Sequence, residues 1–197
     1  MYPELFDKLV EEFRKLPGVG LKTAQRYAFA ILDREENEIE DMAATLLNAK
    51  KELKPCECCG FMSQSDKCIF CNDKNRDESL IMVVSFVQDV MAIEKTGTYH
   101  GMYHVLNGVI SSSKGIYPED LNIQNLLNRL NDDVKEIIIA TSPTIDGETT
   151  ALYLDKLLAN KNLLVTRLAH GLPMGSSLDY ADDLTLIKAM SNRTKFE

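Results

Sequence analysis

Five cysteines, all lying between Cys56 and Cys71, are the residues of this sequence whose spacing most clearly predicts chemistry. Two pairs have a two-residue gap: Cys56 with Cys59, and Cys68 with Cys71. Such a gap lets the chain fold back so that both sulfurs reach one ion, and two such pairs supply the four thiolates that tetrahedral zinc prefers. Gly60 follows Cys59 directly and suits a tight turn with a positive φ angle. The spacing predicts a closed, structural zinc site.

Other uses of these cysteines are less consistent with the sequence. Disulfides are typical of exported proteins, but the charged segment 1–8 has no apolar signal core. A redox site needs only one pair, and packed core thiols would not cluster in this way. Cys58 is the odd one out because neighbouring side chains do not easily point at the same metal. We expect Cys58 to be a free thiol or a packed small hydrophobic residue.

The composition indicates a globular protein with one large domain or two small ones. The chain has 197 residues, of which 45% are hydrophobic, and a net charge of -8. The negative charge argues against a protein coated by nucleic acid, but a local basic patch could still bind it. No run of about eighteen apolar residues is present, so no membrane span is predicted. Reduced thiols without a signal segment predict a cytoplasmic protein.

The first third of the chain has the pattern of three helices, with a break rich in proline and glycine between the first two. Apolar residues recur at helical spacing in residues 3–15, 22–32 and 39–53, and Leu16-Pro17-Gly18-Val19-Gly20 forms the break. This order is similar to the helix-hairpin-helix of DNA-binding proteins. An ordinary helical hairpin whose turn needs glycine is the alternative.

Several residues of this segment favour contact with a nucleic-acid backbone. Gly18 and Gly20 would let backbone amides approach a phosphate, and the following helix would present its positive end. Lys22 and Arg26, four positions apart, share a face of that helix. Further positive charge comes from two residues before the turn, Arg14 and Lys15. Contacts of this kind hold phosphates and read no base sequence.

After the cysteines, short apolar runs alternate with helical patterns. This alternation predicts an open, mostly parallel sheet with helices on both faces. A polar linker is expected at 73–79, and a loop with three consecutive serines at 108–118. Strands are expected at 80–84, 103–106, 136–141 and 163–166, and helices at 87–95, 123–130, 146–158 and about 183–190.

Sites in such sheets form beyond the carboxyl ends of the strands. Asp89 follows the first strand there, and Asp146 and Glu148 follow the third. Asp146 and Glu148 could hold a divalent cation through oxygen ligands. Acids in the first turn of a helix also stabilise its dipole, and this alternative is the more common one. His100, His104 and His170 are scattered, and we expect them on the surface or in loops rather than as ligands.

Taken together, the order of these parts resembles the RecR family of bacterial recombination mediators over nearly the whole chain. The matching stretches are Leu16–Gly20 with Lys22, Ala24 and Arg26, the two cysteine pairs, and the segments 93–97, 103–106, 118–121, 167–175 and 178–193. The resemblance implies a helix-hairpin-helix domain at 1–54, a four-cysteine zinc finger at 55–73, a Toprim-like α/β domain at 79–166, and a C-terminal glycine-containing loop and helix at 167–197.

The resemblance also implies a function in recombinational DNA repair without catalysis. Proteins of this family help to load recombinase onto gapped DNA that is coated by single-strand-binding protein. They act with RecO and RecF, and several form rings of four subunits; a dimer is the alternative. By this likeness, Lys22 and Arg26 would face DNA, whereas Asp89, Asp146 and Glu148 would meet RecO or RecF.

One position departs from the family pattern. Toprim enzymes carry a glutamate at the end of the first strand, where this chain has Ser85. A serine cannot act as a carboxylate ligand or as a general acid of useful pKa, so the departure argues against catalysis and tight magnesium binding. A metal-dependent enzyme that nicks or joins DNA, and a zinc-stabilised scaffold without nucleic-acid contact, remain the alternatives. The C-terminal loop lacks the Gly-Lys-Ser/Thr ending of a phosphate loop, so nucleotide binding is not expected.

Overall fold

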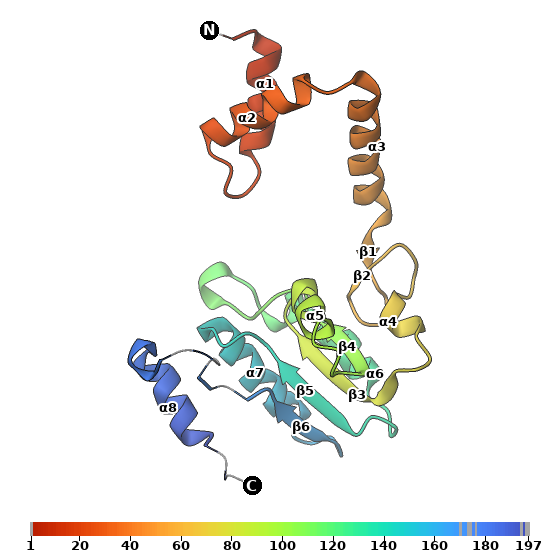
Figure 1. Cartoon of the computed structure of the whole chain (residues 1–197). Coiled ribbons are helices and arrows are strands. Elements are labelled where there is room, and N and C mark those ends of the chain that lie inside the picture. Colours follow the sequence, from red (N-terminus) through yellow and green to blue (C-terminus); the bar gives the residue numbers. More distant parts are fainter. Residues whose placement is uncertain (1, 170, 173–174, 176, 194, 196–197) are drawn as a thin grey trace. The chain divides into compact units, whose positions relative to one another are not determined.

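The structure, a computed structural model, describes all residues except 1, 170, 173–174, 176, 194 and 196–197. The chain divides into two compact units, Met1–Leu53 and Lys54–Glu197 (Figure 1). No helix within the described part of the chain is long and apolar enough to cross a membrane.

The first unit consists of α1 (Glu4–Arg14), α2 (Leu21–Leu32) and α3 (Glu36–Glu52). The first two helices pack against each other around four buried residues: Phe6, Val10, Ala24 and Ala28. Both alanines of this core lie on α2, where their small side chains let the helices approach closely. None of the residues of α3 is buried. The three predicted helices are therefore present, each with ends that differ from the predicted ones by three residues or fewer.

The second unit is built on a four-stranded parallel sheet (Figure 1). Its strands are β3 (Asp77–Val84), β4 (Gly101–Val105), β5 (Glu136–Ala140) and β6 (Leu164–Arg167), and their order is β4-β3-β5-β6. The strands run parallel because helices make the crossovers: α5 (Val87–Glu94), α6 (Ile123–Arg129) and α7 (Ile145–Leu158). The prediction of a mostly parallel sheet with flanking helices is confirmed.

Side chains alternate between the two faces of the sheet, and each face has its own core. Ile81 and Val83 of β3 pack with residues of α6 and α7. Met82 and Val84 pack on the opposite face with Val90 of α5 and with three of the cysteines. The cysteine segment and one face of the sheet therefore share a single hydrophobic core.

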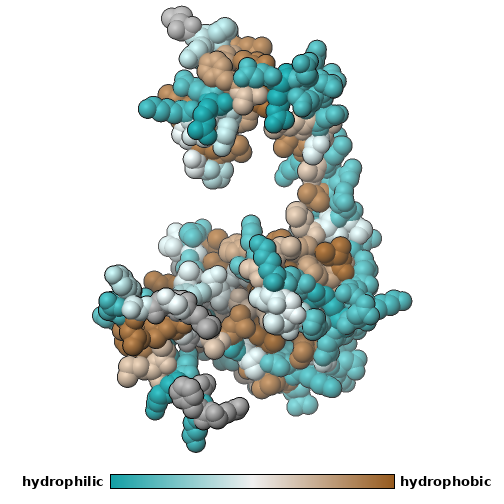
Figure 2. Space-filling model, viewed as in Figure 1, coloured by the Kyte–Doolittle hydropathy of each residue, from teal (hydrophilic) through white to brown (hydrophobic). Residues whose placement is uncertain are grey.

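The remaining elements are short. The cysteine segment contains β1 (Lys54–Pro55), β2 (Met62–Ser63) and α4 (Ile69–Asn72). The predicted loop at 108–118 holds the 3₁₀ turn Ser112–Lys114, and a second one, Pro118–Asp120, begins at its end. The tail has the turn Leu178–Tyr180 and α8 (Asp183–Ser191), over which hydrophobic surface gathers in Figure 2. Residues 170, 173 and 174 of the predicted C-terminal loop lie outside the described residues.

The structure corrects one expectation about histidine. His104 does not lie on the surface or in a loop: it is on β4, and its side chain is fully buried. Its Nε2 lies 2.6 Å from the carbonyl oxygen of Asn122, and its Nδ1 lies 3.2 Å from an Arg129 guanidinium nitrogen. Burial lowers the pKa of His104 to about 4, so the ring is neutral inside the fold. His100 is exposed, as expected, and His170 is outside the described residues.

Candidate metal centre and nucleic-acid interface

The four predicted ligands come together at one point. The sulfur atoms of Cys56, Cys59, Cys68 and Cys71 all lie within 4.8 Å of one another. The Cys56–Cys71 and Cys59–Cys68 sulfur distances are 3.9 Å and 3.4 Å. Four thiolates at about 2.3 Å from a tetrahedral zinc ion would lie about 3.8 Å apart, so the donor set fits such an ion. Among the described residues, this is the one group of three or more potential ligands that converges in this way.

The backbone around Gly60 positions the first cysteine pair. Gly60 has a φ of 76°, a left-handed conformation that glycine adopts without strain. A Cβ atom there would lie 2.6 Å from the Val105 carbonyl oxygen, so the turn also needs glycine for lack of space. The turn is hydrogen-bonded to the end of β4, because Val105 N–H donates to the Cys59 carbonyl at 2.7 Å and the Asn107 amide donates to Gly60 O at 3.1 Å.

Backbone amides also point at the sulfurs. The Cys68 amide donates to the Cys56 sulfur at 3.3 Å, and the Phe61 amide donates to the Cys59 sulfur at 3.5 Å. Hydrogen bonds of this kind favour thiolates, which are the form that binds metal. The thiol of Cys59 lowers the pKa of Cys68 to about 2, whereas hydrogen bonds with Cys58 and two other cysteines raise the pKa of Cys71.

Cys58 lies at the edge of this cluster and outside the four-ligand group. Its side chain is half-buried and packs beside the core that contains Cys56. A hydrogen bond with Cys71 is the main reason why the pKa of Cys58 falls to about 6. All five cysteines are free of disulfide bonds.

Arg76, in the predicted polar linker, fixes the cysteine segment to the sheet. Its guanidinium donates to the Gly101 carbonyl at 2.7 Å and to Glu94 at 2.6 Å. The same group stacks on the rings of Phe70 and Tyr103, at 4.8 Å and 5.3 Å from their centroids. Its side chain is 10% exposed. The sequence pattern missed this role, because an arginine in a polar stretch carries no signal of burial.

The predicted nucleic-acid face of the first unit has an open helix end. Gly18 has a φ of 77°, and Gly20 is the N-cap of α2. No side chain caps this helix, its first turn contains no acid, and nothing lies within 4 Å of a Cβ placed at either glycine. The first amides of α2 are therefore available to an anion, and the helix dipole favours one there.

Two of the four predicted basic residues form ion pairs with acids of the protein, and the other two do not. Arg14 pairs with Glu11 at 2.7 Å, and Lys15 pairs with Glu12 at 2.6 Å. Within the described structure, Lys22 and Arg26 form no ion pair, and both are exposed. The net positive charge beside the helix end comes from these two residues.

The carboxyl edge of the sheet lacks a group of acids. Ser85 follows β3 and Thr141 follows β5, on neighbouring strands. Ser85 is fully buried, and its hydroxyl has no hydrogen-bond partner among the described residues. Thr141 donates to the Gly147 carbonyl at 2.9 Å. This edge is lined by hydroxyl groups and the start of α7.

The three acids expected near this edge each contact a group of the protein itself. Asp89 accepts from the Phe86 amide at 2.8 Å and so caps α5. Asp146 lies 3.8 Å from Lys114. Glu148 accepts from Arg167 at 2.7 and 2.9 Å and from Lys188 of α8 at 2.7 Å. The structure therefore shows a helix cap at Asp89 and ion pairs at Asp146 and Glu148, and the role of these acids as partner contacts remains a prediction.

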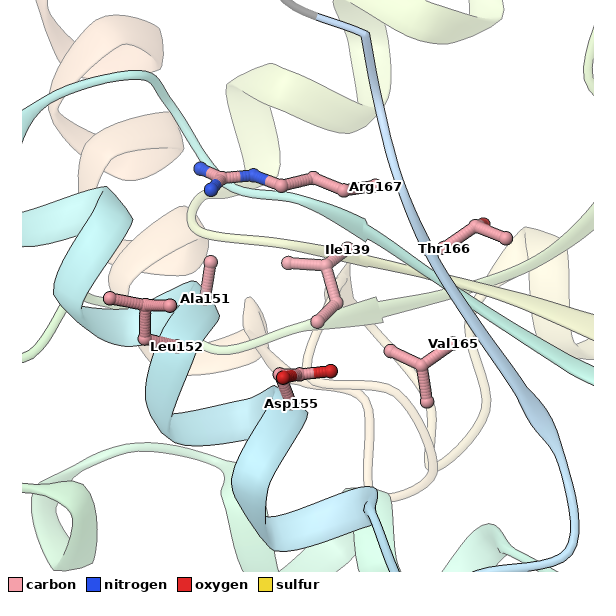
Figure 3. A pocket seen from close by; sticks show the side chains of 7 residues that line it. All are labelled: Ile139, Ala151, Leu152, Asp155, Val165, Thr166 and Arg167. Atoms are coloured by element: carbon pink, nitrogen blue, oxygen red, sulfur yellow. The ribbon is translucent and has the colours of Figure 1, made fainter. Parts of the chain in front are cut away.

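A pocket of about 220 Å³ opens beside α7, β5 and β6 (Figure 3). Its walls are mainly apolar, and Asp155 and the Arg167 side chain line it as well. The Arg167 guanidinium forms an ion pair with Glu148. The pocket is smaller than typical ligand sites and brings together no set of potential metal ligands, so we assign no ligand to it.

Comparisons with known families divide the chain in the same order as its structural parts. Residues 6–50 match the family model of the RecR helix-hairpin-helix. Residues 79–169 match a Toprim domain, and residues 171–194 match the RecR C-terminal family.

The chain belongs to the RecR family.

Membership gives the site a context. The family is one of recombination-repair mediators, so a helix-hairpin-helix, a four-cysteine metal-binding cluster and a Toprim domain belong to one repair protein. Asn107 and Asn122 were missed as structural residues of the metal centre: Asn122 donates to Val105 O at 3.0 Å, beside the Gly60 turn. The Asn107-Gly108 dipeptide is a turn signal, and Asn107 does have a φ of 59°.

Proposed function

We propose that this protein is a DNA-binding mediator of recombinational repair that catalyses no reaction itself. The proposal is supported above all by the open amide end of α2 beside the unpaired side chains of Lys22 and Arg26 in a RecR-type helix-hairpin-helix. Two cations and free amides suit phosphate oxygens, which every DNA sequence offers. Binding would therefore be independent of base sequence. Gly18 and Gly20 would leave room for the sugar-phosphate backbone to approach, with Arg14 and Lys15 adding charge at the rim.

We assign the four-cysteine cluster to structural zinc. All four ligand positions are protein sulfurs, so no position remains for a reacting water. Zinc bound there would hold the cysteine segment against the sheet core that it shares. The chain's own contribution is the orientation of the sulfurs by the Gly60 turn and by backbone amides.

The proposal that the protein catalyses no reaction is supported by the arrangement of the carboxyl edge. Ser85 replaces the usual acid and is buried without a partner, and Glu148 is held by two cations. A divalent cation would have to displace these cations before Glu148 could bind it. We therefore infer that the Toprim domain serves as a binding domain, and we do not assign magnesium to it.

We further propose that the protein acts with RecO and RecF to load recombinase onto gapped DNA coated by single-strand-binding protein. The acids Asp89, Asp146 and Glu148 remain our candidates for the partner surface of the Toprim domain. Asp146 is the best placed of the three, because its contact with Lys114 is long and exchangeable. A homodimer or a ring of subunits would add avidity to weak binding by one chain. Since the DNA of a bacterial cell lies in the cytoplasm, we propose that location.

The proposal is tested by DNA binding across a salt series. The double variant K22A/R26A should weaken binding and reduce the slope of log affinity against log salt by about 1.5 to 2, one phosphate contact for each lost cation. R34A is the matched control, because Arg34 is an exposed arginine beyond the other end of α2. An unchanged slope in the double variant would favour a scaffold without DNA contact. Magnesium-dependent nicking that is lost in D146N would favour the enzyme instead.

A further inference from the structure

One face of α2 carries two cations followed by an aromatic ring. Lys22, Arg26 and Phe29 are four and three positions apart, so they lie on one side of the helix. All three residues are exposed, whereas Ala24 and Ala28 are buried against α1. The stripe formed by the three exposed residues spans about 10 Å, the length of about three nucleotides of a DNA strand.

Phe29 belongs to a cluster of three rings at the end of this stripe. Its ring centroid lies 4.7 Å from that of Phe6 and 5.9 Å from that of Tyr2, and the Tyr2 and Phe6 centroids are 4.7 Å apart. Phe6 is buried in the core of the unit, but Phe29 and Tyr2 remain 45% and 47% exposed. Contacts with a core residue hold the two outer rings in place. Together they offer a preformed aromatic surface to another planar group.

The charges along the stripe indicate which planar group this is. Neither Lys22 nor Arg26 has an ion pair within the described structure, so both cations are available beside the rings. Proteins that bind single-stranded nucleic acid combine these two features: cations follow the phosphates, and aromatic rings stack on the bases. Every base has a π-face, so such a surface needs no particular base sequence.

A duplex cannot use the rings in this way. Its bases are paired and stacked on one another, and taking one out of the stack costs free energy. A single strand offers its phosphates and its base faces together. We propose that α2 binds single-stranded DNA, with Lys22 and Arg26 on neighbouring phosphates and with Phe29 and Tyr2 stacked on bases. The assignment names the form of DNA that the helix-hairpin-helix prefers, and it rests on the proposed function.

The first experiment compares F29L with Y27L in binding to a thymidine oligonucleotide and to a duplex, each about 20 nucleotides long and so longer than a typical single-strand site. Phe29 and Tyr27 are 45% and 40% exposed, but Tyr27 lies off the stripe, edge-on to Phe13. F29L should weaken binding to the single strand about fivefold or more and leave duplex binding unchanged, because only the single strand can stack on the ring. Y27L should bind both DNAs as the original protein does.

Tyr2 provides a second variant, because it precedes α1 and its replacement does not interrupt a helix. Y2L should weaken binding to the single strand about threefold, whereas Y2F keeps the ring and should retain the original affinity. A 2-aminopurine base within the thymidine oligonucleotide reports stacking directly, because its fluorescence is quenched when it stacks. The original protein and Y2F should quench it more strongly than F29L and Y2L do. Far-UV circular dichroism verifies that each variant is folded.

The outcomes separate stacking from the proposed function. If folded F29L lost affinity equally for both DNAs, or for neither, the stacking proposal would be wrong. A smaller mass of F29L in light scattering, without a selective loss of single-strand binding, would mean that protein covers the rings instead. An unchanged salt slope in K22A/R26A would reject phosphate contact whatever F29L does. A reduced slope in K22A/R26A with intact single-strand binding in F29L would support DNA binding and reject only the stacking.

Discussion

The cysteine cluster and the carboxyl edge of the sheet both contain residues that can bind metals, but these residues converge in the cluster and lie apart at the edge. Four sulfurs converge within 4.8 Å, with backbone amides directed at two of them. The acids of the edge diverge: Asp89 caps a helix, and Glu148 binds two cations of the protein. The four cysteine sulfurs are arranged so that they could bind a cation together. Asp146 and Glu148, in contrast, already pair with lysine and arginine side chains of the protein.

This difference indicates how to distinguish a metal site from a collection of ligand types. In a metal site the ligands face one another and their hydrogen bonds come from backbone amides, which leave the lone pairs directed at the centre. At the carboxyl edge, arginine and lysine side chains neutralise Asp146 and Glu148, and Asp89 accepts a hydrogen bond from an amide of its own helix end.

The largest effect is expected for C68A. Removal of one sulfur weakens metal binding severely, and because the cysteine segment shares its core with the sheet, both should unfold together. We expect a loss of at least about 4 kcal/mol in the free energy of unfolding, a large part of the stability of a typical domain. Thermal unfolding followed by circular dichroism, with zinc measured in parallel, provides the result.

C58A is the matched control for this loss. Cys58 lies next to the cluster but outside the four-ligand group, so C58A should retain zinc and lose less than about 1 kcal/mol. A zinc-free C68A that unfolds at the temperature of the original protein would show that the metal does not stabilise the sheet.

The sequence could predict the metal ligands because their information is local. Two short gaps, one glycine and four identical side chains specify the centre without reference to the rest of the chain. The helices and strands were predictable for a similar reason, since apolar periodicity reports burial along one element. The observed ends of these elements differ from the predicted ends by a few residues where a capping side chain sets the boundary. One example is Thr144, whose side chain accepts from Gly147 N–H, so that α7 begins before Asp146.

The contacts of Glu148, Arg76 and His104 could not be predicted because their partners are distant in sequence. Glu148 meets Lys188 across 40 positions, and the Arg76 guanidinium reaches Gly101 across 25. His104 was wrongly expected at the surface, because its burial depends on Arg129 and on the carbonyl of Asn122. Spacing along the chain contains none of these pairings.

The next effect in size concerns Ser85. Glutamate at this position would place a carboxylate where the side chain is fully buried and no cation of the described structure pairs with it. We expect S85E to lose about 3 kcal/mol in urea unfolding, because burial of an unpaired charge is costly. S85A is the control: it removes an unsatisfied hydroxyl and should be neutral or stabilising by up to about 1 kcal/mol. If S85E kept the full free energy of unfolding, and if magnesium stabilised it more than the original protein, the carboxyl edge would be a metal-binding site.

The smallest effect concerns Glu148 and depends on pH. The Arg167 guanidinium, followed by Lys188, lowers the pKa of Glu148 to about 2 from an ordinary 4.5. Its carboxylate therefore stabilises the folded state above pH 4.5, and this contribution disappears as the pH falls through 2. E148Q should lose about 1 kcal/mol at pH 7, a value reduced by solvent screening of the partly exposed pair.

The difference between E148Q and the original protein should shrink as urea unfolding is repeated from pH 7 toward pH 3. D146N is the neighbouring control, since its carboxylate lies 3.8 Å from Lys114 and should contribute less than about 0.5 kcal/mol. Magnesium supplies the decisive comparison. If Asp146 and Glu148 act as ion-pair partners, magnesium should leave the melting temperatures of all three proteins unchanged. Stabilisation by magnesium that disappears in both variants would mean that the cation displaces Arg167 and Lys188. The carboxyl edge and the cysteine cluster would then both bind metal and would differ only in affinity.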